Sequence, residues 1–331
     1  MKLPRRQFLH LAAGAVALPA VAREASAQAF PTRPIRLVVP FPPGGVYDAL
    51  GRPWADKMKP LLGTVIVENV GGAGGGIGGI GGAAVARARP DGYTILLGGL
   101  AIHVINWVAV SRPLYDPRDM ESVSILGSAT FAIAAHSAVP VLTLKELIDF
   151  AKANPGKLSY GSAGVGSLNH LTGEIFKSLT GLPDIAHVPY RGAGPALTDL
   201  ISGQIPLAVV SVSGQVIELH RSGKLRMLAV TTPKRVPAAP EIPTAIEAGL
   251  PGLVTEQFIG LFAPAGTPRP IIDQIAKATR SALADPDFQQ RMFALGFEVA
   301  PDSSPDKMQK IVESEFAYWT PVIKSIGLKL D

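Results

Sequence analysis

The stretch IRLVVPFPPGGVYDALG, residues 35–51, joins a strand to a glycine turn and then to a helix. Its first residues are mostly aliphatic and predict a buried strand, and its last residues begin a helical period. The same order follows again downstream. Strands are expected at 35–39, 65–67 and 93–97, with helices from about 48 to 61 and ending near 89. This β-α-β-α-β order predicts a parallel sheet covered by helices on both faces.

A second unit begins near residue 130. Thr143 and Glu146 form a capping box that opens a helix, and Asn154-Pro155-Gly156 stops it. Strands are expected at 158–161, 186–189, 205–212 and 225–230, with helices at 167–179, 195–201 and 215–221. The remainder is expected to be mostly helical. Its signals are a capping box at 244–247, a capping residue before a proline at Thr267, Asp285 and Ser304, and a last helix at about 305–324.

The composition narrows the classes of function. The chain has 331 residues, of which 47% are apolar and 17% charged, enough for two lobes with their own cores. Its net charge is +5, but residues 1–27 hold four basic residues against Glu24 and account for +3, leaving +2 on the remainder. No basic run is interleaved with aromatic residues, so nucleic acid is not expected as a partner. The absence of cysteine excludes disulfides, thiolate catalysis and thiolate metal sites.

The N-terminus, residues 1–27, is typical of a signal peptide. Arg5-Arg6 forms a basic start, Leu11 to Ala22 is an apolar stretch of small residues, and Ala25-Ser26-Ala27 is a cleavage site before Gln28. A membrane span needs about 20 apolar residues, and this stretch is shorter. The arginine pair followed by Phe-Leu indicates twin-arginine export of a folded protein. We therefore expect a mature chain without a membrane span, working in the periplasm.

Three turns share a glycine-rich strand end followed by a helix start. They are PPGG before Asp48, GSAGVGS at 161–167 and YRGAGP at 190–195. Glycine lets backbone N–H groups approach a ligand, and a helix start offers unpaired N–H donors with a partial positive charge. Such turns bind anions, and in parallel sheets they gather at the carboxyl ends of the strands. Either each is only a tight turn, or the three form an anion cleft with Arg191 as a bidentate carboxylate partner.

Other chemistries find less support in the residues. GGGIGG at 74–79 fits the GxGxxG pattern of dinucleotide sites, but the next strand ends in Gly98-Gly99 and supplies no acidic residue. No G-x-S-x-G elbow supports a serine nucleophile, and the six histidines lack metal-ligand spacing. His170, three residues after Ser167, is either a donor in the cleft or a capping and packing residue. We therefore expect no cofactor and no metal site.

The longer motifs resemble those of the tripartite tricarboxylate transporter receptors, also called the Bug family of periplasmic solute-binding proteins. The matching segments run from residue 31 to about 268, and together they are highly specific. They include PTRPIRLVVPFPPGGVYD, VIVENVGGAGG, ARPDGYTILLGG, LKELIDFAKANPGKLSYGSAGVGSLNHLTGE, HVPYRGAGPALTDLISGQ and GKLRMLAVTT. The resemblance implies an α/β, type II-like periplasmic-binding-protein fold. Two parallel-rich sheets flanked by helices are expected, with a ligand cleft between two lobes.

The resemblance also implies where the ligand lies. One lobe is expected from residues 28–130 with 240–331, and the other from residues 131–239. The carboxylate of the ligand is expected in the cleft, held mainly by backbone N–H groups of the loops. The binding residues carried over are Phe41, Gly44, Gly45 and Asp48 in the first lobe, and Ser162, Ala163, Gly166, Ser167, His170, Tyr190, Arg191 and Gly192 in the second.

Three functions are compatible with these residues. The leading hypothesis is a receptor, expected as a monomer, that captures a small organic carboxylate for membrane transporter subunits. Family members often carry an Asp within the stretch that here is Pro206–Ser211, and its absence favours a ligand with a neutral or apolar distal end. A ligand sensor for a membrane signalling partner uses the same fold and stays open. A secreted α/β hydrolase or isomerase using His170 or Asp48 is the third, and it requires a positioned acid–base pair.

Overall fold

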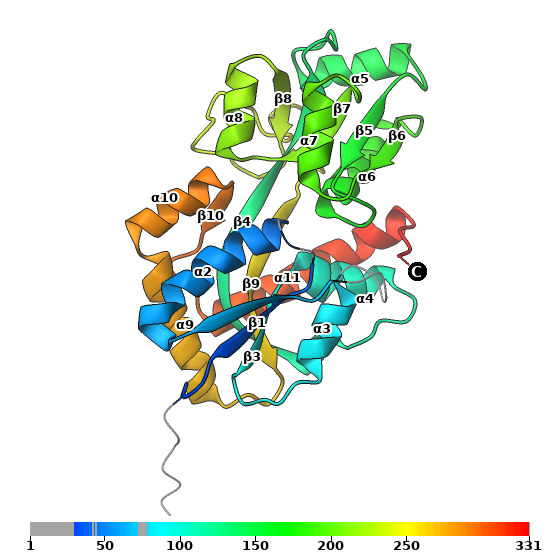
Figure 1. The fold of residues 1–331 in the computed structure, drawn as a ribbon. Helices are drawn as coiled ribbons and strands as arrows, with labels where there is room; N and C mark the ends of the chain where they lie inside the picture. Colours follow the sequence, from blue (N-terminus) through cyan, green and yellow to red (C-terminus); the bar gives the residue numbers. More distant parts are fainter. Residues whose placement is uncertain (1–29, 42, 44, 72–77, 331) are drawn as a thin grey trace, which may run out of the picture. The chain divides into compact units, whose positions relative to one another are not determined.

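The computed structural model describes residues 30–41, 43, 45–71 and 78–330. The predicted signal peptide lies outside the described residues, and the helices and strands described below belong to one compact unit, Arg33–Asp331. Strands and helices alternate along most of this unit, as the sequence predicts (Figure 1). Among the described helices, none combines the length and the apolar character that crossing a membrane requires.

The strands have the following bounds: β1 Ile35–Val39, β2 Val65–Asn69, β3 Thr94–Gly99, β4 Met120–His136, β5 Ser159–Ser162, β6 Ala186–Pro189, β7 Leu207–Ser211, β8 Leu225–Val230, β9 Glu256–Pro264 and β10 Phe297–Val299. The α-helices are α2 Val46–Leu62, α3 Gly79–Ala86, α4 Asn106–Ala109, α5 Leu144–Ala153, α6 Leu168–Thr180, α7 Ala193–Ile201, α8 Gly214–Arg221, α9 Arg269–Leu283, α10 Pro286–Ala294 and α11 Pro305–Ser325. A π-helix, η1 Ala101–Ile105, and a 3-10 turn, η2 Pro117–Asp119, complete the set.

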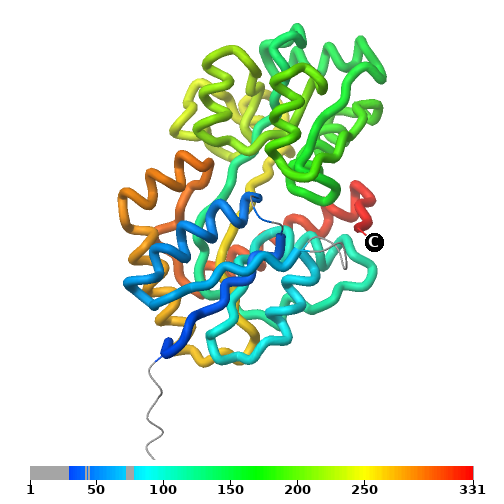
Figure 2. Tube along the Cα trace, viewed as in Figure 1, coloured from blue at the N-terminus to red at the C-terminus, as the bar shows by residue number. Residues whose placement is uncertain are grey.

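The long strand β4 joins two groups of strands. Its first half, up to Thr130, pairs with β9 and β10, and β9 continues through β3 and β1 to β2. Its second half, from Phe131, pairs with β8 on one side and with β7 on the other, followed by β5 and β6. Figure 2 traces β4 beside β9 and then onward into the second group.

Parallel and antiparallel pairs occupy different places in the sheet. The pairs β1–β2, β1–β3, β5–β6 and β5–β7 are parallel, whereas β4 is antiparallel to all four of its partners. Parallel strands end at one edge, so the glycine turns after β1 and after β5 each lie at the carboxyl edge of their own group. These are two of the three turns that the sequence singles out for anion binding; the third follows β6.

Helix α2 covers the first group because one of its faces is apolar. Trp54 and Met58 have no exposed surface, and the indole N–H of Trp54 donates to the hydroxyl of Thr279 on α9 at 3.3 Å. A Cβ added to Gly51 would lie 2.8 Å from the side chain of Leu97 on β3. The close approach at Gly51 seats α2 on the sheet, and the buried indole anchors it. Truncating such a tryptophan to alanine typically costs about 3–5 kcal/mol.

The glycines of α3 allow close packing of the helix. A Cβ on Gly81 would lie 2.6 Å from the Cβ of Pro40, and one on Gly82 would lie 2.5 Å from the ring of Tyr115. The small residues therefore let the helix approach its neighbours closely. The rest of the glycine-rich segment, residues 72–77, lies outside the described residues.

The predicted helix caps are mostly confirmed. Asp285 accepts two backbone N–H groups at the start of α10, and Ser304 accepts one at the start of α11. The prediction for Thr267 is wrong, because Pro268 is the N-cap of α9 and the Thr267 hydroxyl donates instead to the carbonyl of Pro264 at 2.6 Å. The capping box at 244–247 forms reciprocally, with bonds of 2.8 and 3.1 Å, but it closes a turn instead of opening a helix.

Candidate ligand-binding site

A glycine turn joins the end of β5 to the start of α6. Gly164 and Gly166 have φ values of 121° and 78°, a region that favours glycine. Ser167 is the N-cap of α6: its hydroxyl accepts the N–H of His170 at 3.2 Å and donates to the carbonyl of Gly164 at 2.7 Å. The Ser162 hydroxyl, at the end of β5, accepts the N–H of Gly164 at 3.1 Å. These bonds fix the shape of the turn.

The turn presents backbone N–H groups that its own bonds leave unused. In the described part of the chain, no acceptor is found for the N–H groups of Ala163, Val165, Leu168 and Asn169. The buried side chain of Asn169 donates to the carbonyl of Val209 at 2.8 Å and so ties the helix start to β7. Because unpaired N–H groups and the helix N-terminus both carry partial positive charge, this turn suits an anion.

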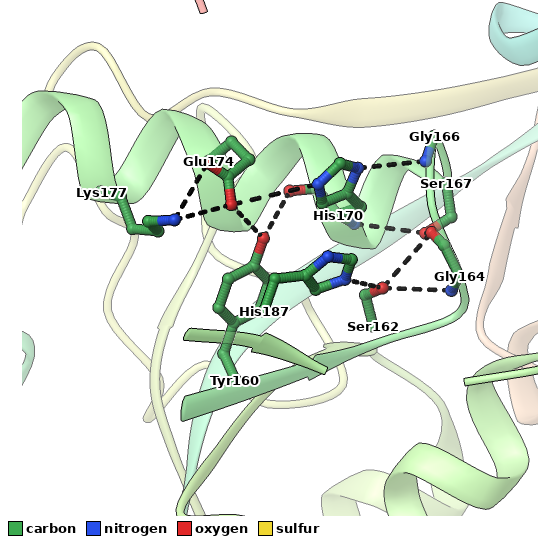
Figure 3. Close-up of polar contacts among 9 residues, drawn as sticks. All are labelled: Tyr160, Ser162, Gly164, Gly166, Ser167, His170, Glu174, Lys177 and His187. Atoms are coloured by element: carbon green, nitrogen blue, oxygen red, sulfur yellow. Dashed lines mark hydrogen bonds and ion pairs between the residues drawn. The ribbon is translucent and has the colours of Figure 1, made fainter. Parts of the chain in front are cut away.

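Two imidazole rings lie beside the turn (Figure 3). The rings of His170 on α6 and His187 on β6 stack with centroids 4.1 Å apart and an interplanar angle of 16°. His170 accepts the N–H of Gly166 through Nδ1 at 3.0 Å, and His187 Nε2 lies 2.6 Å from the Ser162 hydroxyl. Burial is the main cause that lowers the pKa of His170, and likewise the main cause that lowers the pKa of His187 to about 4. Both rings are therefore neutral at pH 7.

A half-buried carboxylate lies next to the imidazoles. Glu174 accepts the phenol O–H of Tyr160 at 2.7 Å and the ammonium of Lys177 at 3.0 Å (Figure 3). Burial alone would raise the pKa of Glu174, but the bonds from Tyr160 and Lys177 outweigh it and leave the pKa below its ordinary value. The carboxylate is thus ionised, with its charge matched by Lys177, and it adds little repulsion for an anion at the turn.

The turn after β6 lies against the turn after β5. The N–H of Tyr190 donates to the carbonyl of Ser162 at 3.1 Å, and the N–H of Gly192 donates to the carbonyl of Ala163 at 3.2 Å. Arg191, between them, is exposed, and no hydrogen bond or ion pair of its side chain is found within the described residues. Its guanidinium is available to a second charged group of a ligand.

The Tyr190 phenol is bonded to a residue of α7. It donates to the carboxylate of Asp199 at 2.7 Å. Desolvation, and after it the bond to Asp199, raises the pKa of Tyr190 to about 12. The hydroxyl is therefore committed to an internal bond, and what this residue offers the turn is its backbone.

The residues predicted for the first lobe lie near Asn69, at the end of β2. The Asn69 amide donates to the carbonyl of Phe41 and to Oδ1 of Asp48, each at 3.0 Å. Arg52 donates to Oδ2 of Asp48 at 2.8 Å, so both carboxylate oxygens have partners. Gly45 is the N-cap of α2 and provides no side-chain cap, which leaves the first turn of that helix to other acceptors. Gly44 lies outside the described residues.

Comparisons with known proteins identify the family. The sequence profile of the tripartite tricarboxylate transporter family receptor matches residues 51–328. This chain belongs to that family. A UPF0065 protein of Bordetella pertussis is 36% identical over 315 residues, covering 95% of this chain and 96% of that one. Protein BugT of the same organism is 32% identical over 318 residues, with the same coverage of 95% and 96%.

Solved structures of similar proteins confirm the predicted fold class. Periplasmic binding protein BugD matches with a TM-score of 0.79 at 37% identity, covering 91% of this chain and 99% of that chain. A Rhodopseudomonas palustris protein with adipate matches with a TM-score of 0.80 at 34% identity, covering 90% and 99%. MatC from Rhodopseudomonas palustris with bound malate matches with a TM-score of 0.78 at 31% identity, covering 89% and 100%.

The structure divides the predicted site residues into two groups. The structure brings Ser162, Ala163, Gly166, Ser167, His170, Tyr190, Arg191 and Gly192 together around the turns after β5 and β6. Phe41, Gly45 and Asp48 form the group around Asn69. Sequence reasoning missed Asn69, Asn169 and His187. The position of Asn69 at a strand end was a usable signal, whereas His187 becomes visible only through the register Tyr160↔His187 between β5 and β6.

Proposed function

We propose that this protein is an extracytoplasmic receptor that captures a small organic carboxylate in a cleft between two lobes. The carboxylate is held by the N–H groups of the turn after β5, and the ligand is handed to the membrane subunits of a tripartite tricarboxylate-type transporter. The observation that carries the proposal is the set of unused N–H donors at Ala163, Val165, Leu168 and Asn169. Two relatives of the same family, at 34% and 31% identity, hold adipate and malate, both dicarboxylates.

Arg191 has a role in this proposal as the partner of a second carboxylate. Its backbone lies between two residues bonded to Ser162 and Ala163, so its side chain starts beside the N–H cluster. A guanidinium binds a carboxylate through two parallel N–H bonds, which a lysine does not reproduce. The first-lobe group, with Gly45 at the uncapped start of α2, supplies the opposite wall in this proposal.

The division into lobes is part of the proposal. The predicted boundaries are residues 28–130 with 240–331 for one lobe and residues 131–239 for the other. The boundary between residues 130 and 131 is supported by the pairing of β4, whose partner changes from β9 at Thr130 to β7 at Phe131. A periplasmic location and export through the N-terminal segment complete the proposal, as does action as a monomer.

We propose a binding role without catalysis, and the contacts of the candidate acid–base groups support it. Both oxygens of Asp48 are bonded, to Asn69 and to Arg52. The Nδ1 atom of His170 is occupied by the N–H of Gly166. Ser162 lies near His187, but it has no exposed surface through which a substrate carbonyl could reach it. A hydrolase or isomerase requires one such group to face the ligand.

A binding screen tests the proposal directly. The mature chain, from Gln28, is titrated by calorimetry and by thermal shift with adipate, malate and a panel of other carboxylates, each beside its amide. Binding only to the folded state adds about 2.7 kcal/mol of stability at 100 times the Kd. We expect at least one acid to bind while its amide does not. Equal response to acid and amide, or a response to neutral solutes alone, contradicts carboxylate capture.

A pair of glycine variants locates the binding. Gly166→Ala places a side chain at φ 78°, inside the turn, and Gly181→Ala does the same at φ 66°, at the other end of the same helix. Each costs about 1–2 kcal/mol of stability because an L-residue is strained there. We expect only Gly166→Ala to weaken ligand binding. Equal ligand affinities in the two variants would show that the ligand does not bind at the turn after β5.

A further inference from the structure

His170 is a buried residue of α6 that is hydrogen-bonded to the glycine turn after β5. Its ring is buried, with 8% of the residue exposed, and its Nδ1 atom faces inward to the N–H of Gly166 at 3.0 Å. A backbone N–H only donates, so Nδ1 must be unprotonated and the proton of the neutral ring lies on Nε2. This bond fixes the orientation of the peptide group between Val165 and Gly166, in the middle of the proposed carboxylate turn.

The charged and titratable groups that face this ring either favour its neutral form or are already hydrogen-bonded to other residues. From its own helix, Glu174 lies 4.0 Å from Nε2, beyond hydrogen-bond reach, and its oxygens are bonded to Lys177 and to Tyr160 of β5. From β6, the ring of His187 stacks on it at 4.1 Å (Figure 3). Glu174 is the one group that favours a charged His170, and Lys177 opposes it.

We infer that His170 is the positioning residue of the carboxylate turn: its unprotonated Nδ1 holds the N–H of Gly166, and protonation of that atom releases the turn and the ligand with it. This inference rests on the proposed function, since it gives the same site a built-in response to pH. The residue acts through Gly166 and makes no contact of its own with the ligand.

Protonation is disruptive here because of the geometry. A proton on Nδ1 would point at the N–H of Gly166, so two donors would meet within 3.0 Å. The bond is then lost and both donors are left unpaired. Gly166 has φ 78° and, as a glycine, has other conformations open to it, so the peptide group between Val165 and Gly166 can reorient once that bond is lost, while Ser162 and Ser167 still hold Gly164. The N–H groups on either side of the bond would then no longer converge on one carboxylate.

The protonation state is measured first, without any ligand. In the full mature chain labelled with 15N-histidine, long-range 1H–15N correlation spectra report which ring nitrogen carries the proton. We expect His170 with a bare Nδ1 and a proton on Nε2 at pH 7.5, and the protection of the Gly166 amide against hydrogen exchange to fall as the ring protonates. A proton on Nδ1 at pH 7.5 would overturn the inference.

Two variants separate positioning from packing. His170→Asn keeps an acceptor, the amide oxygen, near the place of Nδ1 but does not titrate, whereas His170→Ala removes the acceptor. We expect protection of the Gly166 amide to persist in His170→Asn at every pH and to be lost in His170→Ala. If His170→Ala does not fold, the comparison of wild type with His170→Asn still decides. Protection in wild type and His170→Asn that changes identically with pH refutes the role of the ring proton.

Ligand affinity is then measured between pH 7.5 and 4.5 with adipate and malate as probes. Because both proteins bind the same probe, the ratio of the wild-type Kd to the His170→Asn Kd cancels the effect of protonation of the probe itself. We expect this ratio to rise by about three- to tenfold as pH falls below the ordinary histidine range near 6.5, the change expected for one lost hydrogen bond. A constant ratio overturns the inference.

His220 supplies a matched control outside the site. Its Nδ1 atom on α8 also accepts a backbone N–H, that of Met227, at 3.2 Å. His220→Asn should therefore leave the affinity and its pH dependence as in the wild type. If neither adipate nor malate nor any other acid of the panel binds at pH 7.5, the proposed function fails, while the 15N spectra and the exchange of Gly166 still decide the positioning role.

Discussion

His103 gives the fold a pH dependence whose size follows from its surroundings. It lies on η1 with 1% of its surface exposed, stacked on Phe262 at a centroid distance of 3.5 Å. Nδ1 lies 3.3 Å from the carbonyl oxygen of Gly99, and within the described residues Nε2 has no hydrogen-bond partner. Burial lowers the pKa of His103 to about 3, with the bond to Gly99 opposing the shift.

The direction and the size of this pH dependence follow from the difference in the pKa of His103 between the folded and the unfolded chain. The folded chain keeps His103 neutral down to about pH 3, whereas the unfolded chain takes up the proton near pH 6.5. The contribution of His103 is therefore complete above pH 6.5 and is lost as pH falls from 6.5 towards 3. The slope is about 1.4 kcal/mol per pH unit, so about 2 kcal/mol of stability is lost by pH 5.

Urea unfolding of wild type and two variants isolates this effect. His103→Phe preserves a ring against Phe262, and His103→Gln preserves a polar side chain, but neither titrates. The difference in free energy of unfolding between pH 8 and pH 5 should be about 2 kcal/mol larger in the wild type than in either variant, whatever the variants cost at pH 8. If the three differences agree within about 0.5 kcal/mol, the reasoning from burial is refuted, because His103 then protonates equally in both states.

Three further predictions concern packing and caps, each measured by the free energy of unfolding. Gly82→Ala should cost about 1–3 kcal/mol, because its Cβ would lie 2.5 Å from the ring of Tyr115; no loss would mean that this ring moves freely. Thr231→Val should cost about 1–3 kcal/mol, since its buried hydroxyl donates to the carbonyl of Thr255 at 2.7 Å. An unchanged free energy of unfolding would mean that this carbonyl finds another hydrogen-bond donor in the variant. Ser304→Ala should cost about 1 kcal/mol through loss of the cap of α11, and Ser304→Asp should restore it.

Local signals in the sequence predicted the elements that local physics controls. The strands at 35–39, 186–189 and 225–230 have the expected bounds, and short runs rich in aliphatic residues identify the first and the last of them. The helix starting after Thr143 and the cap at Asp285 follow from side chains that bond to the next turn of their own helix. Such bonds span three residues and need no knowledge of the rest of the fold.

The strands β4 and β9 were not predicted, and their partners explain why. β4 is rich in Ala, Ser and Gly, and its register with β9 shifts twice, between Ser122 and Ser124 and between Ile125 and Gly127. Such a strand is stabilised by partners that are distant in the sequence, and strand propensity depends strongly on that context. The final third of the chain was therefore expected to be mostly helical, although β9 lies between β3 and β4.

The candidate site likewise combines features that local sequence predicts with features that depend on distant residues. The glycine turn after β5 was visible in the sequence because its donors are backbone N–H groups, which any residue supplies once the conformation allows it. The side chains that fix that conformation were not visible. His187 reaches Ser162 only because β6 pairs with β5, and Asn169 reaches β7 only because α6 crosses it. Backbone donors make the anion preference readable from glycine spacing, while the precision of the site depends on long-range contacts that spacing does not encode.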